Sequence, residues 1–322
     1  MQIILGSMRA VFLDAGTFGK EEILSPLKSL PLEWTYYRET EKEDLEQRAI
    51  DVDLIITKKV ILDAVFLSRT QAKYILIAST GTNNIDLQRA KEKGILVSNV
   101  PRYSSSSVAQ LTITFLLMLS ESLGFYLRDV REGRWQKGSL FTSVGYPFEE
   151  IEGKKLGIIG YGAIGKEVAR KAKALGMQIL ICQSLTGEKK EGTTPFEELL
   201  KLCDFLTLHV PLTSKTKDLI QEKELRMMKK TSCLINVSRG GIVHEGALLK
   251  ALQEKWIRAA ALDVLTEEPP AEDHPLLHYS EPNLILTPHI AWASLEAKKR
   301  AIQIIKRNIE SFLQKSPENL VV

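Results

Sequence analysis

Short apolar runs and charged stretches alternate along the first hundred residues of the chain. Four of the runs are rich in β-branched residues and predict strands, at residues 10–13, 54–57, 74–78 and 95–97. Charged stretches between them predict helices, as at residues 40–49 and 86–93. Strands that alternate with helices form a parallel sheet with helices on both faces. We therefore expect an α/β fold in this part of the chain.

A second series of the same kind begins at Lys155. Six apolar runs predict strands, at residues 156–159, 178–181, 205–208, 233–236, 259–262 and 284–286. The stretches between them predict helices, as at residues 164–175 and 245–254. Six strands that alternate with helices are typical of a doubly wound, nucleotide-binding sheet. We expect this sheet to be of the Rossmann type.

Two further helices are expected beside these sheets. A serine run at residues 104–107 precedes an apolar stretch that predicts one helix from Val108 to Val130, with the serines at its N-cap. The last helix, residues 294–313, is expected to cross back to the first sheet. The sequence thus predicts two doubly wound domains. The nucleotide-binding one comprises residues 101–292, and the other is discontinuous and comprises residues 1–100 and 293–322.

Composition narrows the class of protein. The chain has 43 Lys and Arg against 40 Asp and Glu, a formal net charge of +3, which argues against nucleic acid or an anionic membrane as partner. The longest apolar stretch, residues 113–119, is far shorter than the roughly 20 residues that cross a bilayer. Cys182, Cys203 and Cys233 are scattered in apolar runs, which predicts buried, reduced thiols in a cytoplasmic protein.

A glycine motif predicts a dinucleotide site. In the run LGIIGYGAIG, Gly160, Gly162 and Gly165 form the pattern G-x-G-x-x-G between a predicted strand and a predicted helix. Gly160 permits the tight turn, Gly162 lets a pyrophosphate approach the backbone, and Gly165 lets helix and strand pack closely. Free N–H groups at the start of the helix, at Ala163 and Ile164, would bind the phosphates.

The residue that binds the ribose departs from the usual pattern. An acid is expected at the end of the second strand of such a site, and this chain has Gln183 and Ser184 there. Glutamine can hydrogen-bond a ribose and does not repel a 2′-phosphate as an acid would. Lys189 and Lys190 lie nearby and would either bind such a phosphate or remain solvated loop charges. The sequence therefore leaves the choice between NAD and NADP open.

Polar candidates for catalysis follow three strands of the same predicted sheet, where doubly wound sheets place their ligands. Arg239 could hold a carboxylate through two N–H groups and polarise the adjacent carbonyl. Asp263 and Glu268 follow the next strand, and His289 follows the last one. Hydride transfer to a carbonyl needs a proton donor, and histidine suits this role near neutral pH. A neighbouring Glu268 would orient the imidazole and favour its charged form.

The other histidines are assigned separately. His209 ends the third strand of the second series, and we expect it in the nicotinamide-side wall of the cofactor site. His244, His274 and His278 lie at a helix start or in loops and are expected to be exposed. No pair has the spacing of a zinc motif such as H-E-x-x-H, so no metal site is predicted.

Six motifs together resemble the D-isomer-specific 2-hydroxyacid dehydrogenases over nearly the whole chain, and within them the glycerate dehydrogenase/hydroxypyruvate reductase group. The motifs are ASTGTNNIDLQRAKEKGILVSNVP, GIIGYGAIG, HVPLTSKT, NVSRGGIVHE, LDVLTEEP and TPHIAWAS. The resemblance implies an NAD(P)-dependent oxidoreductase that transfers a hydride between the nicotinamide and a small 2-keto or D-2-hydroxy acid, above all hydroxypyruvate or glyoxylate. It implies a Rossmann-type cofactor domain and a flavodoxin-like substrate domain.

The resemblance also assigns roles to residues. It implies a catalytic set of Arg239, Glu268 and His289, with Asp263 near the nicotinamide carboxamide. Backbone N–H groups of the loop formed by Gly81, Thr82, Asn83 and Asn84 would bind the substrate carboxylate. Further cofactor contacts are expected at Pro211, Thr216, Val237 and Ser238. Members of the family are usually homodimers joined through the cofactor domain, with residues 124–153 embracing the partner.

Two other readings remain open. Corepressors of the same fold bind NAD and recruit partners, but the complete catalytic set favours an enzyme. Formate or phosphite dehydrogenases of similar fold are the alternative among enzymes. Gln110 stands where many relatives have Glu, and no chemistry depends on it. The sequence settles neither the acid that is reduced nor the physiological direction of the reaction.

Overall fold

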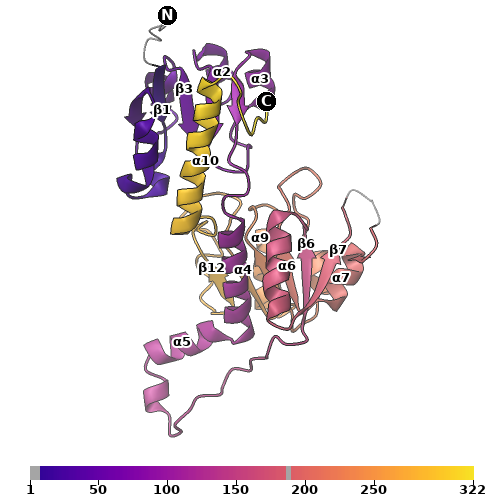
Figure 1. Ribbon diagram of the computed structural model, residues 1–322. Helices are drawn as coiled ribbons and strands as arrows, with labels where there is room; N and C mark the ends of the chain where they lie inside the picture. The colour runs from indigo at the N-terminus through magenta and orange to yellow at the C-terminus, as the bar shows by residue number, and fades with distance from the viewer. Residues whose placement is uncertain (1–7, 186–189) are drawn as a thin grey trace, which may run out of the picture. The chain divides into compact units, whose positions relative to one another are not determined.

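The computed structural model describes residues 8–185 and 190–322. These residues divide into two compact units, one within Met1–Ser104 and Ala293–Val322 (unit 1) and one within Ser105–Trp292 (unit 2). Each unit has its own parallel sheet, as the alternation of strands and helices predicted. Figure 1 shows the chain coloured from indigo to yellow, and the yellow helix α10 (Leu295–Leu313) belongs to the unit of the indigo strands.

The sheet of unit 1 has five parallel strands in the order β2-β1-β3-β4-β5, the order of flavodoxin-like folds. The strands are β1 (Met8–Phe12), β2 (Leu32–Tyr36), β3 (Leu54–Thr57), β4 (Tyr74–Ile77) and β5 (Leu96–Ser98). The pattern of apolar runs did not predict β2. This strand lies at the edge of the sheet, and its residues are alternately exposed and half-buried, so no continuous apolar run marks it.

Helices cover both faces of this sheet. The helices α1 (Leu45–Ala49), α2 (Ala64–Arg69) and α3 (Leu87–Glu92) pack with Ile55, Ile75 and Ile77 of the strands. The opposite face is covered by α10, whose Phe312 stacks on Tyr74 of β4 at 4.3 Å between ring centres. The 3-10 helix η2 (Glu21–Ser29) packs against α10, and a shorter one, η1 (Ala15–Phe18), precedes it. The predicted return of the last helix to the first sheet is therefore confirmed.

The sheet of unit 2 has seven parallel strands in the order β12-β11-β10-β9-β6-β7-β8, which is Rossmann order with an extra strand at one edge. The strands are β6 (Lys155–Ile159), β7 (Gln178–Cys182), β8 (Thr193–Thr194), β9 (Phe205–Leu208), β10 (Cys233–Asn236), β11 (Ala259–Leu262) and β12 (Leu284–Leu286). The order reverses between β6 and β9, where doubly wound sheets bind their ligands.

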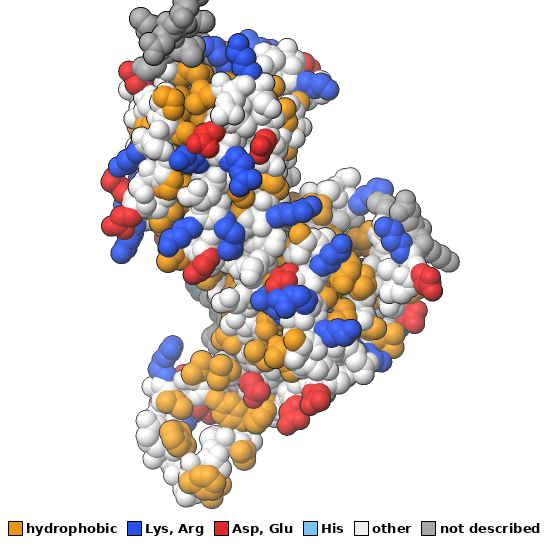
Figure 2. Space-filling view, in the orientation of Figure 1, with side chains coloured by type: hydrophobic (Ala, Val, Ile, Leu, Met, Phe, Trp, Pro, Cys, Tyr) orange, Lys and Arg blue, Asp and Glu red, His pale blue; other side chains and the backbone are white. Residues whose placement is uncertain are grey.

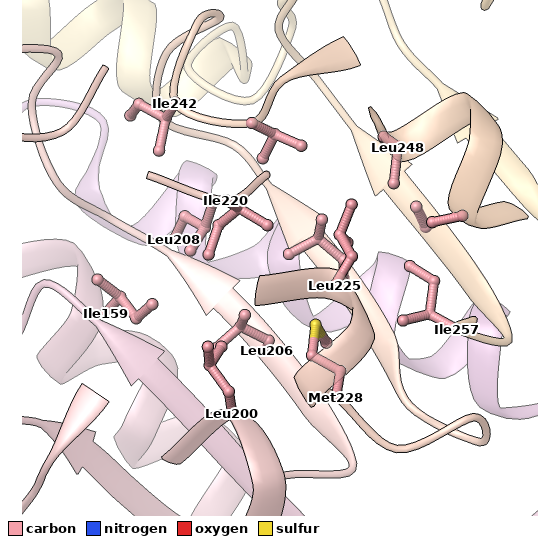
Figure 3. Close-up of a cluster of buried hydrophobic side chains, with 14 of the residues drawn as sticks. Ile159, Leu200, Leu206, Leu208, Ile220, Leu225, Met228, Ile242, Leu248 and Ile257 are labelled. Carbon is pink, nitrogen blue, oxygen red and sulfur yellow. The ribbon is translucent and has the colours of Figure 1, made fainter. Parts of the chain in front are cut away.

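Successive residues of these strands pack on opposite faces of the sheet. Leu206 and Leu208 join a cluster under α7 (Phe196–Leu202), α8 (Glu222–Met227) and α9 (Glu245–Gln253), which Figure 3 shows. Phe205 instead packs with α4 (Ser105–Ser120) and α6 (Ala163–Ala174) on the other face. Strands buried on both faces read as continuous apolar runs, which explains why the sequence located β9, β10 and β11 well. The prediction of six strands is wrong by one, because the edge strand β8 consists of two half-buried threonines and no apolar run marks it.

The predicted single helix from Val108 to Val130 is wrong, because the chain turns within it. The helix α4 ends at Ser120, and α5 (Leu123–Arg131) leaves at 70° after Ser122, which adopts the left-handed conformation with φ of 50°. Gly124 lies so close to the carbonyl of Pro282 that a Cβ would come within 2.8 Å of its oxygen, so α5 begins directly against that loop. A 3-10 turn, η3 (Trp135–Lys137), follows α5.

Among the described residues, no single helix is long and apolar enough to cross a membrane. The bent pair α4 and α5 passes by length and composition alone, and α4 packs in the core of unit 2.

Candidate functional site

The glycine motif forms a tight turn at the switch point of the unit 2 sheet. Gly160 has φ of 95°, and a Cβ there would lie 2.5 Å from the carbonyl oxygen of His209. A Cβ on Gly165 would lie 2.2 Å from the carbonyl oxygen of Gly160. By contrast, a Cβ on Gly162 would meet nothing within 4 Å. The first and third glycines are therefore required by the fold, and the second leaves its backbone open to a ligand.

The helix that follows this turn offers unsatisfied donors. The N-cap Gly162 accepts the first helical hydrogen bond, from Lys166, and no side chain caps α6. Among the described residues, no group accepts a hydrogen bond from the N–H of Ala163 or Ile164. Free N–H groups and the positive end of the helix dipole at the same place favour an anion. The residues present therefore fit the pyrophosphate of a dinucleotide.

The end of β7 carries no acid in the structure either. Gln183 follows β7 directly, and its N–H donates to the carbonyl of Thr194 at 2.8 Å. Its side chain is half-buried, and Ser184 and Lys190 are exposed. Lys189 lies outside the described residues. A neutral amide therefore stands where an acid would bind the ribose.

The catalytic candidates lie at one edge of the unit 2 sheet, because β10, β11 and β12 are parallel neighbours. Backbone hydrogen bonds hold these strand ends together. The N–H of Asp263 donates to Asn236 at 2.9 Å, and the N–H of His289 donates to the carbonyl of Asp263 at 2.8 Å. The loops that carry Arg239, Glu268 and His289 therefore begin side by side.

The side chains of Glu268 and His289 are in contact. Nδ1 of His289 lies 2.5 Å from Oε2 of Glu268, and the two side chains are 25% and 23% exposed. The other oxygen of Glu268 accepts from the N–H of Leu265 at 3.1 Å, which fixes the carboxylate. When the carboxylate is ionised it accepts from Nδ1–H, so Nε2 is the ring nitrogen that is left to contact a ligand. Among the described residues, none hydrogen-bonds to Nε2.

The turn that carries Arg239 is held by Asn236, which the sequence analysis did not single out. Asn236 is buried, its Oδ1 accepts from the N–H and the hydroxyl of Ser238 at 3.0 and 2.8 Å, and its Nδ2 donates to the carbonyl of Arg239 at 2.9 Å. An asparagine at a strand end before a turn is the signal that could have revealed it.

The guanidinium of Arg239 keeps most of its donors available. One nitrogen donates to the carbonyl of Ser238 at 2.7 Å, and the described residues offer its remaining N–H groups no acceptor. Val237 beside it is buried, and Ser238 is half-buried. A Cβ on Gly240 would lie 1.9 Å from the carbonyl oxygen of Leu265. The turn after β10 therefore packs directly on the loop that leads to Glu268.

Asp263 shapes the loop that carries His289. Its buried carboxylate accepts from the hydroxyl of Thr287 at 2.5 Å and from the N–H groups of Ile290 and Ala291 at 2.8 Å each. Burial raises the pKa of Asp263, although these hydrogen bonds oppose the shift. His289 adopts φ of 53°, a conformation uncommon for residues other than glycine, and the bonds from Asp263 hold it there.

The model of a known family matches residues 113–291, and its description is "D-isomer specific 2-hydroxyacid dehydrogenase, NAD binding domain". A protein of Haemophilus influenzae that carries the family name without a particular substrate is 43% identical over 311 residues, which span 95% of this chain and 98% of that one. The chain belongs to the D-isomer-specific 2-hydroxyacid dehydrogenases. It is therefore an NAD(P)-dependent oxidoreductase of 2-hydroxy acids.

Other members of the family carry more specific names. A glycerate dehydrogenase of Methylorubrum extorquens is 37% identical, with 97% of this chain and 98% of that one covered. A hydroxypyruvate reductase of Blautia hydrogenotrophica is 36% identical, with 88% of each chain covered.

Solved dehydrogenase structures share the fold. D-lactate dehydrogenase of Aquifex aeolicus, solved with NAD and lactic acid, has a TM-score of 0.85 at 29% identity and covers 97% of this chain and 99% of its own. An acyclic imino acid reductase, solved with NADPH and D-Arg, has a TM-score of 0.86 at 28% identity and covers 98% of this chain and 100% of its own.

In this dehydrogenase, His209 lies beside the glycine turn as a neutral group. Its N–H donates to Ile159 at 2.7 Å, and Nε2 lies 3.1 Å from the hydroxyl of Thr207. Burial lowers the pKa of His209 to about 3. Its Nδ1 is buried and has no hydrogen-bond partner among the described residues. An imidazole in this state can pack beside a cofactor but cannot supply a proton near neutral pH.

Three further sequence expectations can be placed. Thr216 is buried, and its hydroxyl donates to the carbonyl of Pro211 at 2.6 Å, so it shapes the loop after β9. His244 and His278 are exposed as expected. The expectation that His274 is exposed is wrong, because Glu245 at the start of α9 reaches it at 3.1 Å and its side chain is only 15% exposed.

The loop expected to bind the substrate carboxylate lies in unit 1, after β4. Among the described residues, no group accepts a hydrogen bond from the N–H of Gly81, Thr82 or Asn83. The loop is braced from both sides, because Asn84 donates through Nδ2 to Val60 at 3.1 Å and Asn99 donates to Thr80 at 2.8 Å. A braced loop with three free N–H groups suits a carboxylate.

The cysteines take no part in this site, and the acidic and histidine side chains do not form a metal-binding cluster in the described part of the chain. Cys182, Cys203 and Cys233 are buried and, within the described part of the chain, form no disulfide. In residues 8–185 and 190–322, no three His, Cys, Asp or Glu side chains gather as metal ligands would.

Proposed function

We propose that this dehydrogenase reduces a small 2-keto acid, either hydroxypyruvate to D-glycerate or glyoxylate to glycolate. The observation that supports this most directly is the contact between Glu268 and His289, beside the turn that carries Arg239. The names of the relatives, glycerate dehydrogenase and hydroxypyruvate reductase, point to the same small acids.

In the proposed reaction, bound NADH or NADPH supplies the hydride. Arg239 holds the substrate carboxylate with two N–H groups and polarises the neighbouring carbonyl. As the carbonyl carbon gains the hydride, the carbonyl oxygen takes a proton from Nε2 of His289. Glu268 stabilises the imidazolium and holds its ring in the orientation that turns Nε2 to the substrate. In oxidation the same atoms act in reverse.

The remaining residues of the set have binding roles. The N–H groups of Gly81, Thr82 and Asn83 bind the substrate carboxylate. The turn from Gly160 to Gly165 binds the pyrophosphate, and Gln183 binds the ribose. Ser238 and Asp263 belong to the nicotinamide end of the cofactor site, with His209 as a neutral wall.

A panel of substrates tests this proposal. Purified protein should oxidise NADH or NADPH with hydroxypyruvate or glyoxylate, and Arg239→Lys should lose most of kcat/KM for the acid while its nucleotide affinity is retained. Lysine keeps the charge but not the planar pair of donors. Oxidation of formate or phosphite instead would favour that class of dehydrogenase. Nucleotide binding without turnover of any acid would favour a corepressor-type protein.

We also propose that the enzyme is a homodimer joined through the segment 123–150, here called the arm. The arm is held together by its own contacts, with Tyr126 donating to the carbonyl of Tyr146 at 2.6 Å. It exposes large apolar side chains, including Phe141 at 91% and Val144 at 73%. Figure 2 shows hydrophobic side chains gathered on this segment. An exposed apolar patch of this kind marks an interaction surface, and a second copy is the partner we propose.

The proposed compartment is the cytoplasm. Three buried cysteines without a disulfide fit a reducing environment.

A further inference from the structure

Unit 1 contains a buried lysine at the carboxyl edge of its sheet. Lys58 follows the last residue of β3, and it is only 7% exposed. Its ammonium donates to the carbonyl of Ala78 at 3.3 Å and to the hydroxyl of Tyr103 at 3.1 Å. It also lies 5.5 Å from the ring centre of Phe18 and 5.3 Å from that of Tyr103. A fully buried lysine is rare, because removing an ammonium from water is costly.

The backbone around Lys58 is fixed by a buried acid. The carboxylate of Asp14 accepts hydrogen bonds from the N–H groups of Lys58 at 2.9 Å and Lys59 at 2.7 Å. These bonds hold the turn after β3 in one conformation. The backbone that carries the Lys58 side chain is therefore fixed by contacts within unit 1.

Lys58 is tied to the loop of residues 79–84 in two ways. Ala78, which accepts from the ammonium, immediately precedes this loop. Val60, two residues after Lys58, accepts from the side chain of Asn84 at the far end of the loop. The ammonium is shielded from bulk water by neighbours that include Ala78, Tyr103 and Phe18, so an anion on the loop would experience its charge through a medium less polar than water.

We propose that Lys58 is a positioning and specificity residue, which fixes the base of this loop and selects a carboxylate over a neutral group there. The inference rests on the proposed function, because it takes residues 81–83 as the carboxylate-binding donors. It adds that affinity for the substrate depends on the charge at residue 58 as well as on the loop N–H groups.

Oxamate and oxamide provide the test, because they are similar in shape and only oxamate is charged. Their binding to the holoenzyme with saturating NADH is measured by titration calorimetry. Wild type should bind oxamate more tightly than oxamide. Lys58→Gln, which keeps a donor for Ala78 but no charge, should lose about tenfold or more in oxamate affinity, because the attraction between one buried charge and the carboxylate is lost. Its oxamide affinity should change less than about twofold.

Two variants serve as controls. Lys58→Arg keeps the charge and should retain the preference for oxamate. Lys59→Met removes the same charge from the adjacent exposed position and should change neither affinity. Thermal melting and the NADH dissociation constant verify that each variant is folded.

The outcomes separate this inference from the proposed function. Equal losses for oxamate and oxamide in Lys58→Gln, or no loss for either, would overturn the role of Lys58. A wild type without a preference for oxamate would overturn it as well. Failure of the wild type to reduce any 2-keto acid would instead contradict the proposed function, because the binding measurement requires no turnover.

Discussion

At the level of single residues, the candidate site depends on two buried polar side chains that position others. Asn236 holds the turn of Arg239, and Asp263 holds the loop of His289. Both are buried and have their oxygens occupied by backbone donors, which is the usual condition for a buried polar group. The reactive groups, by contrast, retain unused donors or acceptors. Two histidines, His289 and His209, each lead to a prediction.

The first prediction concerns the proton donor. His289→Gln should lose about 10²- to 10⁴-fold in kcat while its nucleotide affinity is unchanged. Glu268→Gln preserves the hydrogen-bonding shape but leaves the imidazolium without a carboxylate partner. Its rate of reduction should therefore fall below that of wild type, because the imidazolium loses its stabilising partner.

Stopped-flow measurements of both directions across pH check these expectations. A rate of reduction in Glu268→Gln equal to that of wild type would contradict the role of the carboxylate. Near-wild-type turnover in His289→Gln would remove His289 from the reaction.

The second prediction concerns His209, whose pKa is lowered to about 3 by burial from a value of 6.5. Between these pH values the unfolded chain binds a proton at this residue and the folded chain does not. The free energy of unfolding therefore falls as the pH falls, by up to about 1.4 kcal/mol per pH unit. His209→Asn lacks this group, so its unfolding free energy should decline less steeply on acidification below about pH 6.5.

Urea titrations of wild type and His209→Asn at a series of pH values measure the difference. Parallel pH dependences for the two proteins would show that His209 is not buried in its neutral form.

At the level of elements, two glycines of the turn after β6 are expected to have different roles, Gly160 in stability and Gly162 in nucleotide binding. Gly160→Ala places a Cβ against the carbonyl of His209 in a left-handed conformation, and it should destabilise the protein by about 2–4 kcal/mol. Gly162→Ala meets no protein atom, so it should leave stability unchanged and weaken nucleotide binding.

Denaturant titration and nucleotide titration distinguish the two variants. The idea is wrong if Gly162→Ala binds NADH as wild type does, because its Cβ would then lie outside the ligand's path.

The next prediction is that the residue after β7 determines the preference for NADH or NADPH. With neutral Gln183 there, the wild type should accept NADPH at least comparably to relatives with an acid. Gln183→Asp should shift the ratio of kcat/KM toward NADH by about tenfold or more, since a carboxylate repels the 2′-phosphate. Gln183→Asn keeps a neutral amide and serves as the control.

Steady-state kinetics with both nucleotides give the ratio directly. A wild type that already uses NADH more than about a hundredfold better, which is about 2.7 kcal/mol, would refute the argument.

The sequence predicted those elements that are buried on both faces. The expected bounds of β3, β9, β10 and β11 agree with the structure, because continuous apolar runs mark buried parallel strands. The bounds of β12 agree as well, although it is a half-buried edge strand, because its three residues are all apolar. It missed the edge strands β2 and β8, which have no buried residues and no continuous apolar run. It also missed the break at Ser122, because packing of Gly124 on Pro282 turns the chain there.

The candidate site was predictable only in part. Strand ends and the glycine spacing pointed to Arg239, His289 and the turn at Gly160, because position relative to a strand can be read from a sequence. The partners of Asn236 and Lys58 could not be foreseen, because hydrogen bonds between distant segments depend on how those segments pack.

At the level of the whole molecule, the arm is the feature that a single chain leaves unexplained. It belongs to unit 2 and exposes apolar side chains that would be costly to leave in water. The homodimer that we propose would cover them, and solution mass tests this directly.

Wild type should sediment with twice the 36.2 kDa of one chain. Charged residues on the arm, as in Phe141→Asp with Val144→Asp, should shift the mass to that of a single chain. Val65→Asp alters an exposed apolar residue of α2, outside the arm, and should leave the dimer intact. A wild type with the mass of one chain would contradict the proposal.

The contact of Gly240 with Leu265 limits which mutations could change the substrate specificity of the enzyme during evolution. Because no side chain fits between these two segments, the turn of Arg239 and the loop of Glu268 can change only together. Mutations that adjust one of them to a new acid would disturb the other and slow the chemistry. If residues 81–84 bind the substrate as we propose, adaptation to a different acid is expected to begin in this loop and at Lys58, because neither belongs to the two interlocked segments of unit 2.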